Sequence, residues 1–261
     1  MSRYFLDTGV LVGTTFLHDA WYQEGKRILN SGNSFYVNRA VKFEYCNSTR
    51  KNSLEGTDVD WDTDEGKFGE KLNSVRPAQT TLNLKLDNIS GEELSVERLV
   101  DEFFLASHIC QKVDGELVVN DEKVDPEKVE EYIRPTILTF LDAVIGEQEL
   151  TRAVARKAID RLFDEVLDGA HRKREKLRMK LREISVRKER REQYRDDFDF
   201  VEGYIDTTIL CELQCLSNDN VVSRIVTTDK SHLYGNRDRI DELTILYVKD
   251  IVADPSLPSE E

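Results

Sequence analysis

Two short apolar segments, one near each end of the chain, stop at an aspartate. The run 4–6 ends at Asp7, and the run 225–228 ends at Asp229. Short runs rich in aromatic and β-branched residues are typical of buried strands. In a sheet of parallel strands the carboxyl ends share one edge, even when the strands are distant in sequence. The fold is therefore expected to unite the two ends of the chain and to place a carboxylate after each of these strands.

The segments around these two strands predict the fold class. Residues 34–37 are expected to form another strand, and residues 40–49 a helix. A strand at 243–248 is expected after the second aspartate, whereas the stretch 9–15 is expected to be a loop or short turn. Strand, helix, strand, helix is the opening of a three-layer α/β/α domain with a central parallel sheet.

A long interruption separates the two parts of this domain. We expect residues 1–50 to form its first half, 51–199 a large and mostly helical insertion, and 200–252 its second half, followed by a disordered tail at 253–261. A connection of this length exceeds an ordinary loop. Within the insertion the sequence predicts a solvated acidic loop at 51–91, a turn at Asp114-Gly115, a helix kinked at Pro135 and a basic helix near 171–195.

Two further carboxylates fall on apolar faces of predicted helices. Glu44 shares a helical stripe with Val37, Ala40 and Val41. Asp206 opens a helix whose inner face is apolar. A carboxylate on a buried face costs several kcal/mol unless it is paired or binds a metal. Each of the four acids could instead cap a turn or a helix, or reach solvent, but together they suggest one shared site.

The donor chemistry of this site predicts its cofactor. Four carboxylates held close together repel one another unless cations neutralise them. Oxygen ligands suit Mg²⁺ or Mn²⁺ rather than zinc. Two such ions about 4 Å apart can activate water and stabilise a leaving oxygen in phosphodiester cleavage. The expected metal ligands and catalytic residues are Asp7, Glu44, Asp206 and Asp229.

These residues resemble the PIN-domain nucleases. The resemblance rests on the strand that ends at Asp7-Thr8, the helical Glu44, the motif 206–209 (Asp-Thr-Thr-Ile) and the motif 227–230 (Thr-Thr-Asp-Lys), and it covers about 1–50 and 200–250. It implies a metal-dependent ribonuclease directed mostly at single strands, with the four acids as metal ligands. Thr227 matches a hydroxyl residue of that family, and Thr8 is a further candidate beside the ligands. Compact PIN domains lack an insertion like 51–199, so an antitoxin partner is not supported.

A basic stretch supplies a candidate nucleic-acid contact. Residues 171–195 carry a net charge of +8, in a protein whose net charge is −14. Contact with phosphates would explain this excess. A solvated helix with ion pairs, or a coiled coil between two copies of the chain, would use the same residues. The candidate contacts are Arg172, Lys173, Arg174, Lys176, Arg178, Lys180, Arg182, Arg187, Lys188, Arg190 and Arg191.

The remaining features bound the function. No apolar run has the length of a membrane span, and the N-terminus lacks the pattern of a secretory signal, so a cytoplasmic protein without a membrane partner is expected. The four cysteines are expected to be buried thiols. A haloacid-dehalogenase-type phosphatase needs an acid where Gly9 stands. The sequence thus predicts a Mg²⁺- or Mn²⁺-dependent endoribonuclease, with a structure-specific DNA nuclease and a non-catalytic RNA- or protein-binding scaffold as alternatives.

Overall fold

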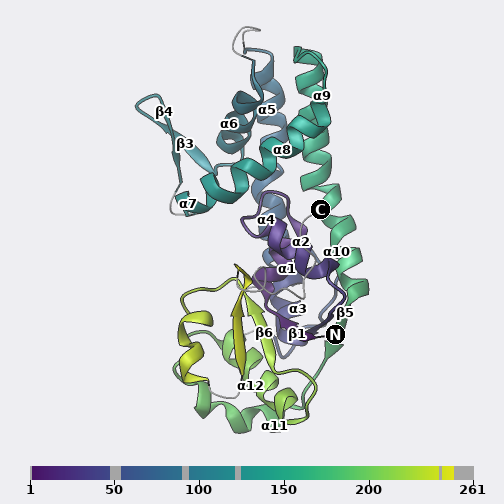
Figure 1. Cartoon of the computed structure of the whole chain (residues 1–261), viewed down its shortest axis with the longest axis vertical. Coiled ribbons are helices and arrows are strands. Elements are labelled where there is room, and N and C mark those ends of the chain that lie inside the picture. The colour runs from purple at the N-terminus through teal and green to yellow at the C-terminus, as the bar shows by residue number, and fades with distance from the viewer. Residues whose placement is uncertain (1, 48–53, 90–93, 121–124, 241–242, 250–261) are drawn as a thin grey trace. The chain divides into compact units, whose positions relative to one another are not determined.

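A computed structural model describes residues 2–47, 54–89, 94–120, 125–240 and 243–249 of the chain (Figure 1). The chain divides into two compact units. Unit 1 comprises residues 1–14, 23–69 and 174–261, and unit 2 comprises residues 15–22 and 70–173. The tail predicted at 253–261 lies outside the described residues.

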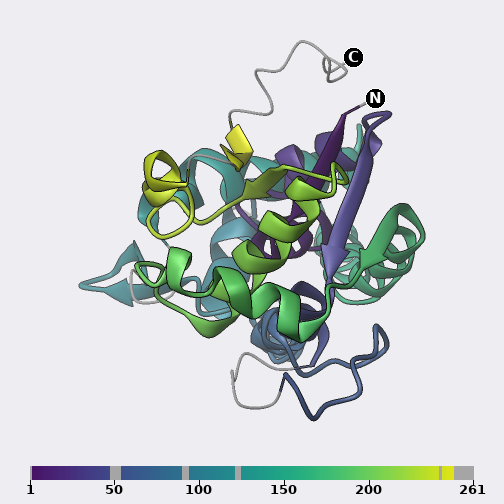
Figure 2. The same cartoon turned by 90° about the horizontal axis from the view of Figure 1, so that it is seen from below.

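Unit 1 is built on a five-stranded sheet in which all strand pairs are parallel. The strand order is β5-β2-β1-β6-β7. Helices flank this sheet, and α12 lies beside its strands in the view of Figure 2. The predicted three-layer α/β/α class is confirmed. The strands are β1 Arg3–Leu6, β2 Ser34–Asn38, β5 Leu181–Ile184, β6 Arg224–Thr227 and β7 Thr244–Tyr247.

The strand order fixes where a site can form. From β1 the chain moves outward to β2 and then to β5, whereas β6 and β7 extend the sheet on the other side of β1. Neighbouring connections therefore diverge between β1 and β6. In open parallel sheets, ligands bind in the crevice at the carboxyl ends of two such strands. Asp7 directly follows β1, and Asp229 comes two residues after β6.

The helices of unit 1 include one that the sequence did not predict. Residues 9–15 were expected to form a loop, but α1 begins at Thr8, directly after Asp7. The amides of Val10 and Leu11 both donate to the Asp7 carbonyl, and both side chains are fully buried. Burial therefore overrides the poor helix propensity of a segment rich in Gly, Thr and Val. The helices that lie wholly or partly in unit 1 are α1 Thr8–Thr15, α2 Tyr22–Asn30, α3 Arg39–Cys46, α4 Lys67–Val75, α10 Asp168–Lys180, α11 Lys188–Arg191, η4 Glu192–Tyr194, η5 Asp196–Phe198, α12 Tyr204–Asn218 and η6 Tyr234–Arg239.

The predicted acidic loop at 51–91 holds for residues 54–66, which form neither helix nor strand, but it was wrong from residue 67 onward. Helix α4 begins at Lys67, and α5 follows it. Phe68, Leu72 and Val75 recur at helical spacing and are buried, as is Trp61 before them. The polar residues between these anchors concealed the period, so the acidic character of the stretch was given too much weight.

The predicted basic helix near 171–195 was right as far as Lys180 and wrong beyond it, because the chain changes structure there. Helix α10 ends at Lys180 and β5 begins at the next residue. Residues Leu181 to Ile184 pair with Phe35 to Asn38 of β2 and form an edge of the sheet. The predicted insertion of 51–199 thus contains a strand of the α/β unit. Local propensity favours a helix here, and pairing with β2 prevails over it.

Unit 2 is mostly helical, with a core that includes Leu99, Phe103, Leu141 and Phe163. Asp114 and Gly115 have φ values of 52° and 89° and form the tight turn of a two-stranded hairpin. A π-helical segment, η3, immediately precedes the helix that contains Pro135, where the sequence predicted a kink. The elements of unit 2 beyond α4 are α5 Ala78–Leu86, α6 Val96–Ala106, β3 Cys110–Val113, β4 Glu116–Val119, α7 Pro126–Lys128, η3 Val129–Ile133, α8 Arg134–Ile145 and α9 Arg152–Val166, and α10 begins there.

The cysteines and the lengths of the helices bear on two further predictions. All four cysteines are buried free thiols, as predicted. Among the helices of the described residues, none is both long enough and apolar enough to pass through a membrane.

Candidate acidic site

Asp7 is held at the end of β1 by two hydrogen bonds. Its Oδ1 accepts from the Thr8 backbone N–H at 2.7 Å, and its Oδ2 accepts from the Thr227 hydroxyl at 2.8 Å. The same hydroxyl oxygen accepts from the Asp229 N–H at 2.9 Å. Thr227 therefore links the ends of β1 and β6 and fixes the orientation of the Asp7 carboxylate. The Thr8 hydroxyl is buried and has no hydrogen-bond partner among the residues that the structure describes.

Glu44 and Lys67 form an ion pair beside Asp7. Glu44 projects from α3, and its Oε1 lies 3.1 Å from Lys67 Nζ at the first residue of α4. The Glu44 side chain is 14% exposed, so this pair is largely shielded from water on the acid's side. The sequence gave Lys67 no role. It is the functional residue that sequence reasoning missed.

Asp206 comes from the first turn of α12. The helix begins at Tyr204, two residues before the expected start, with Gly203 as its N-cap. Asp206 is therefore inside the helix and does not cap it. The hydroxyls of the next two residues, Thr207 and Thr208, donate to backbone carbonyls of the same segment. These hydrogen bonds stabilise the first turn of α12.

Burial, and after it mutual repulsion, raises the pKa of two of the four acids. Burial, followed by the neighbouring Glu44 carboxylate, raises the pKa of Asp7 to about 6. Burial, followed by Asp7, Glu44 and Asp229, raises the pKa of Asp206 to about 7. Lys67 opposes the increase at both positions but does not cancel it. The structure thus brings the four acids within electrostatic reach of one another, and their negative charge exceeds what Lys67 neutralises.

Asp229 lies in a different environment from the other three acids. Its Oδ1 accepts from the backbone N–H groups of Ser231 and His232 and from the Ser231 hydroxyl. Although burial alone would raise the pKa of Asp229, these hydrogen bonds and His232 lower it. The His232 ring nitrogen Nδ1 lies 3.2 Å from the other carboxylate oxygen. Asp229 therefore opens a turn, the alternative role considered for it, while still interacting with Asp206.

Two glycines, Gly9 and Gly66, allow the elements of this site to pack closely because they have no Cβ atom. A Cβ atom on Gly9 would lie 1.9 Å from the Thr228 hydroxyl, so glycine allows α1 to start against the end of β6. A Cβ on Gly66 would lie 2.4 Å from the Glu44 carbonyl and 2.6 Å from the Tyr45 carbonyl. The Gly66 N–H also donates to the Cys46 carbonyl. This approach of the chain to the end of α3 brings Lys67 beside Glu44.

Replacement of Gly66 by alanine is expected to destabilise the protein by about 1–3 kcal/mol, because backbone atoms must move to admit the methyl group. Urea unfolding would measure this change. Gly32→Ala is the matched control, since a Cβ at Gly32 would meet nothing within 4 Å. Equal unfolding free energies for the two variants would contradict the role assigned to Gly66.

The donor set fits a hard divalent cation in its chemistry. Asp7, Glu44 and Asp206 offer only carboxylate oxygens, which Mg²⁺ and Mn²⁺ prefer. The excess negative charge and the buried Thr8 hydroxyl, which has no hydrogen-bond partner within the described residues, both favour a cation at this position. As these side chains lie, however, no group of three His, Cys, Asp or Glu residues within the described part of the chain converges closely enough to hold a metal ion. Binding would therefore require rearrangement of the carboxylates.

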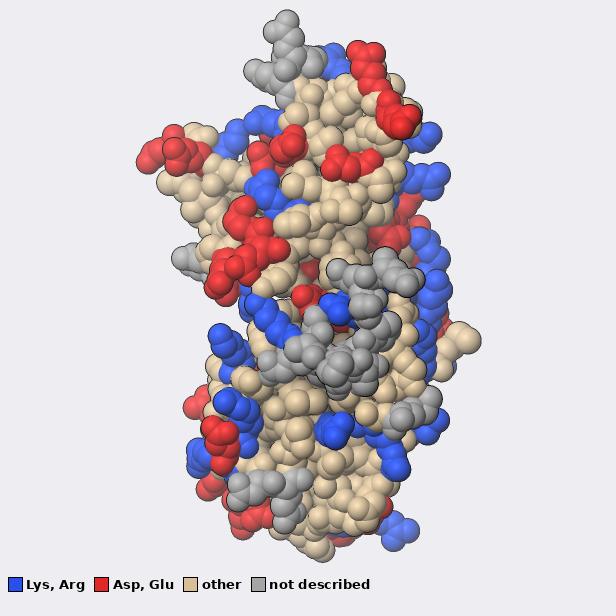
Figure 3. All heavy atoms as spheres, viewed as in Figure 1, with Lys and Arg blue, Asp and Glu red and all other residues tan. Residues whose placement is uncertain are grey.

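The predicted nucleic-acid contacts of the basic stretch are largely engaged with acids of the same chain. Arg174 is buried and pairs with Asp64, and Arg191 pairs with the buried Glu212. On the face drawn in Figure 3, blue basic and red acidic side chains are interspersed and do not form separate fields. Most of these acids come from outside the stretch, so its excess positive charge is largely neutralised within the chain. The other ion pairs join Arg172 and Lys173 to Glu165, Arg178 to Asp62 and Glu175, Lys188 to Glu55, and Arg190 to Asp219.

The other candidate contacts differ in their surroundings. Lys180 donates to the Leu29 carbonyl, and Arg182 lies over the Tyr36 ring. Lys176 and Arg187 are exposed. The structure therefore leaves only part of the predicted basic set in a position to contact phosphates.

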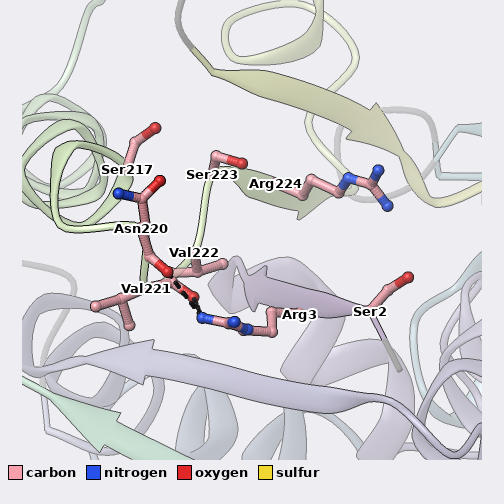
Figure 4. Close-up of a pocket in the computed structure, with 8 residues that line it drawn as sticks. All are labelled: Ser2, Arg3, Ser217, Asn220, Val221, Val222, Ser223 and Arg224. Carbon is pink, nitrogen blue, oxygen red and sulfur yellow. Dashed lines mark hydrogen bonds between the residues drawn. The ribbon is translucent and has the colours of Figure 1, made fainter.

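A pocket of about 440 Å³ lies at the opposite end of the strands from the acids (Figure 4). It is lined by Arg3 and Arg224, the first residues of β1 and β6, by Ser2, by Ser217 near the end of α12, and by residues 220–223 of the connection between α12 and β6. The Arg3 guanidinium donates to the carbonyls of Asn220 and Val221. These hydrogen bonds hold the turn before β6. The pocket is separate from the acidic site, because the two lie at opposite ends of the strands, and it adds no group to that site.

Comparison with known proteins adds no relative to these observations. No family model, no curated protein and no solved structure matches this chain.

Proposed function

We propose that the protein is a Mg²⁺- or Mn²⁺-dependent nuclease of PIN type that hydrolyses phosphodiester bonds of RNA. The observation that carries the proposal is the cluster of Asp7, Glu44 and Asp206 at the switch point of a parallel sheet. These acids come from three distant parts of the chain. A fold that only needed a stable core would gain nothing from placing three repelling carboxylates together.

Each residue of the site has a role in the proposed reaction. Asp7, Glu44 and Asp206 would hold the cations, and the Thr227 hydroxyl keeps Asp7 turned toward them. The cations would supply activation of water and stabilisation of the leaving oxygen. Asp229 anchors the turn beside Asp206 and contributes negative charge. His232, held against Asp229, is exposed and available to the substrate.

A surface next to Asp229 supports nucleic acid as the substrate class. Arg237 stacks over Tyr234 at 4.3 Å, and Arg239 stacks over Phe200 at 3.8 Å. Both arginines are exposed on η6, and the amide of Tyr234 donates to the Asp229 carbonyl. Arginine beside aromatic rings can contact phosphates and stacked bases of a single strand. Although Arg237 lies 3.8 Å from the exposed Asp238, this surface would give the acidic chain a local attraction for RNA beside Asp229.

Cleavage assays with purified protein test the proposal. We expect fluorescently labelled single-stranded RNA to be cut in the presence of Mn²⁺ and to stay intact in EDTA. Parallel reactions with single-stranded DNA and with branched DNA distinguish a ribonuclease from a structure-specific DNA nuclease. Failure to cut any of these substrates, together with failure to bind Mn²⁺, would overturn the proposal.

A non-catalytic scaffold is the second candidate, because the carboxylates do not converge as a ready ligand group in the described residues. Such a scaffold would bind RNA or a protein partner through the surface of η6. It predicts RNA binding that does not depend on Mn²⁺ and is unaffected by substitution of Asp7. Filter-binding measurements with wild-type and Asp7→Asn protein separate it from the nuclease.

A further inference from the structure

Lys67 occupies an unusual position for a lysine. It is the first residue of α4. The start of a helix carries a partial positive charge, so a cation there is disfavoured. Something outside the helix must therefore stabilise the ammonium group. The only ion pair that the structure gives Lys67 within the described residues is the one with Glu44, at 3.1 Å.

The surroundings of Lys67 are those expected for a counter-ion of the acidic site. Although burial alone would lower the pKa of Lys67, the carboxylates of Glu44, Asp7 and Asp206 raise it above its usual value. The same three residues are the candidate metal ligands. A divalent cation that binds them would meet the Lys67 ammonium within the same field, and two cations there repel each other.

We propose that Lys67 is a built-in competitor of the divalent cation: its ammonium group neutralises the acids when no metal is bound, and it leaves Glu44 when the metal binds. This inference rests on the proposed metal site and adds a regulatory element to it. The lysine keeps the carboxylates from separating under their own repulsion. It also sets a threshold concentration of divalent cation that must be exceeded before Glu44 becomes a ligand.

The geometry explains how the exchange could occur without unfolding. The Lys67 side chain is 43% exposed, so its charged end can turn into solvent while its backbone stays in α4. Gly66 keeps the start of α4 against the end of α3, so the lysine remains tethered near the site. A released ammonium beside bound cations is then placed to meet a phosphate of the substrate.

Binding of Mn²⁺ by Lys67→Gln protein, measured by calorimetry or electron paramagnetic resonance, tests the inference. We expect the variant to bind Mn²⁺ about five- to tenfold more tightly than wild type, because the competing charge is gone. We also expect its melting temperature in EDTA at pH 8 to fall below that of wild type. Removal of a lysine from a helix start would by itself raise the melting temperature, so the sign is diagnostic.

Two controls separate the outcomes. Lys26→Gln removes an equal charge from an exposed position on α2 and is expected to change neither quantity. Lys67→Arg keeps the charge and is expected to stay near wild type in EDTA. Unchanged Mn²⁺ affinity in Lys67→Gln, with normal binding by wild type, would overturn the role of Lys67 and leave the nuclease proposal intact. Absence of Mn²⁺ binding by wild type would overturn both.

Discussion

Replacement of Asp206 by asparagine is expected to abolish cleavage and, at the same time, to stabilise the protein in EDTA. The variant loses a carboxylate that the proposed cations need, so we expect cleavage to fall by at least about a hundredfold, since even residues that only support metal ligands can cost that much. It also removes a partly buried negative charge that Asp7 and Glu44 repel. Most substitutions of structural residues reduce both activity and stability. Opposite changes in the two quantities therefore identify a site residue.

The pH dependence gives this prediction a definite sign. The pKa of Asp206 is raised to about 7 in the folded protein from an ordinary value of 3.8. Between these values the folded state binds more protons than the unfolded state, so its stability decreases as the pH rises. We expect Asp206→Asn and wild type to have similar unfolding free energies near pH 4, and the variant to be more stable at pH 8.

Denaturant unfolding in EDTA at both pH values would measure this difference, and added Mn²⁺ should reverse the order at pH 8. Asp7→Asn should show the same pattern over a lower pH range, because the pKa of Asp7 is about 6. Asp197→Asn, an exposed acid near the start of α12, is the matched control. Loss of stability at pH 8 in both site variants would show that these carboxylates support the fold, contrary to the proposal.

Replacement of Arg191 by methionine is expected to destabilise the protein by about 3–5 kcal/mol, because it leaves a buried charge without its partner. Arg191 Nη1 lies 2.7 Å from Glu212 Oε1, and the Glu212 side chain is 3% exposed. Burial raises the pKa of Glu212 despite this arginine. Within the described residues, the Asn38 side-chain amide would then be the remaining hydrogen-bond donor to the Glu212 carboxylate.

The neighbouring residue provides the control for this experiment. Arg190 pairs with Asp219, and both side chains are more than two-fifths exposed. Arg190→Met is therefore expected to destabilise the protein far less than Arg191→Met, because solvent screens an exposed ion pair. The double variant Arg191→Met/Glu212→Leu should recover much of the stability lost by Arg191→Met. Similar losses for Arg190 and Arg191, accompanied by equal losses of RNA affinity, would restore the prediction that both contact nucleic acid.

Hydrophobic periodicity predicted the elements in which burial follows a simple pattern. The strands β1, β2, β6 and β7 are short apolar runs, and α3 and α12 place apolar residues on one face. The sequence failed where tertiary packing decides the conformation. Helix α1 contains glycine and threonine, and β5 is a segment of good helix formers that pairs with β2. Neither outcome has a local signal.

The residues of the candidate site could be predicted only in part, because some of them are positioned by tertiary packing. Acids that follow buried strands are conspicuous, so Asp7 and Asp229 were found without a structure. Lys67 was missed because its position depends on the fit of Gly66 against the carbonyls of α3. A lone glycine before the helical pattern of Phe68, Leu72 and Val75 is the signal that could have indicated it. The hydrogen bonds that hold the Asp229 carboxylate likewise depend on the following turn.

The strand order of the sheet has a consequence for folding during translation. β1 lies between β2 and β6, so it acquires one neighbour early in translation and the other only after residues 224–227 have been synthesised. Asp206, the acid with the most strongly raised pKa, is itself made after four-fifths of the chain. On the proposed function, a nascent chain that lacks Asp206 would have an incomplete set of metal ligands and would not cleave RNA. The split arrangement of the site thus delays any cutting activity until synthesis is nearly finished.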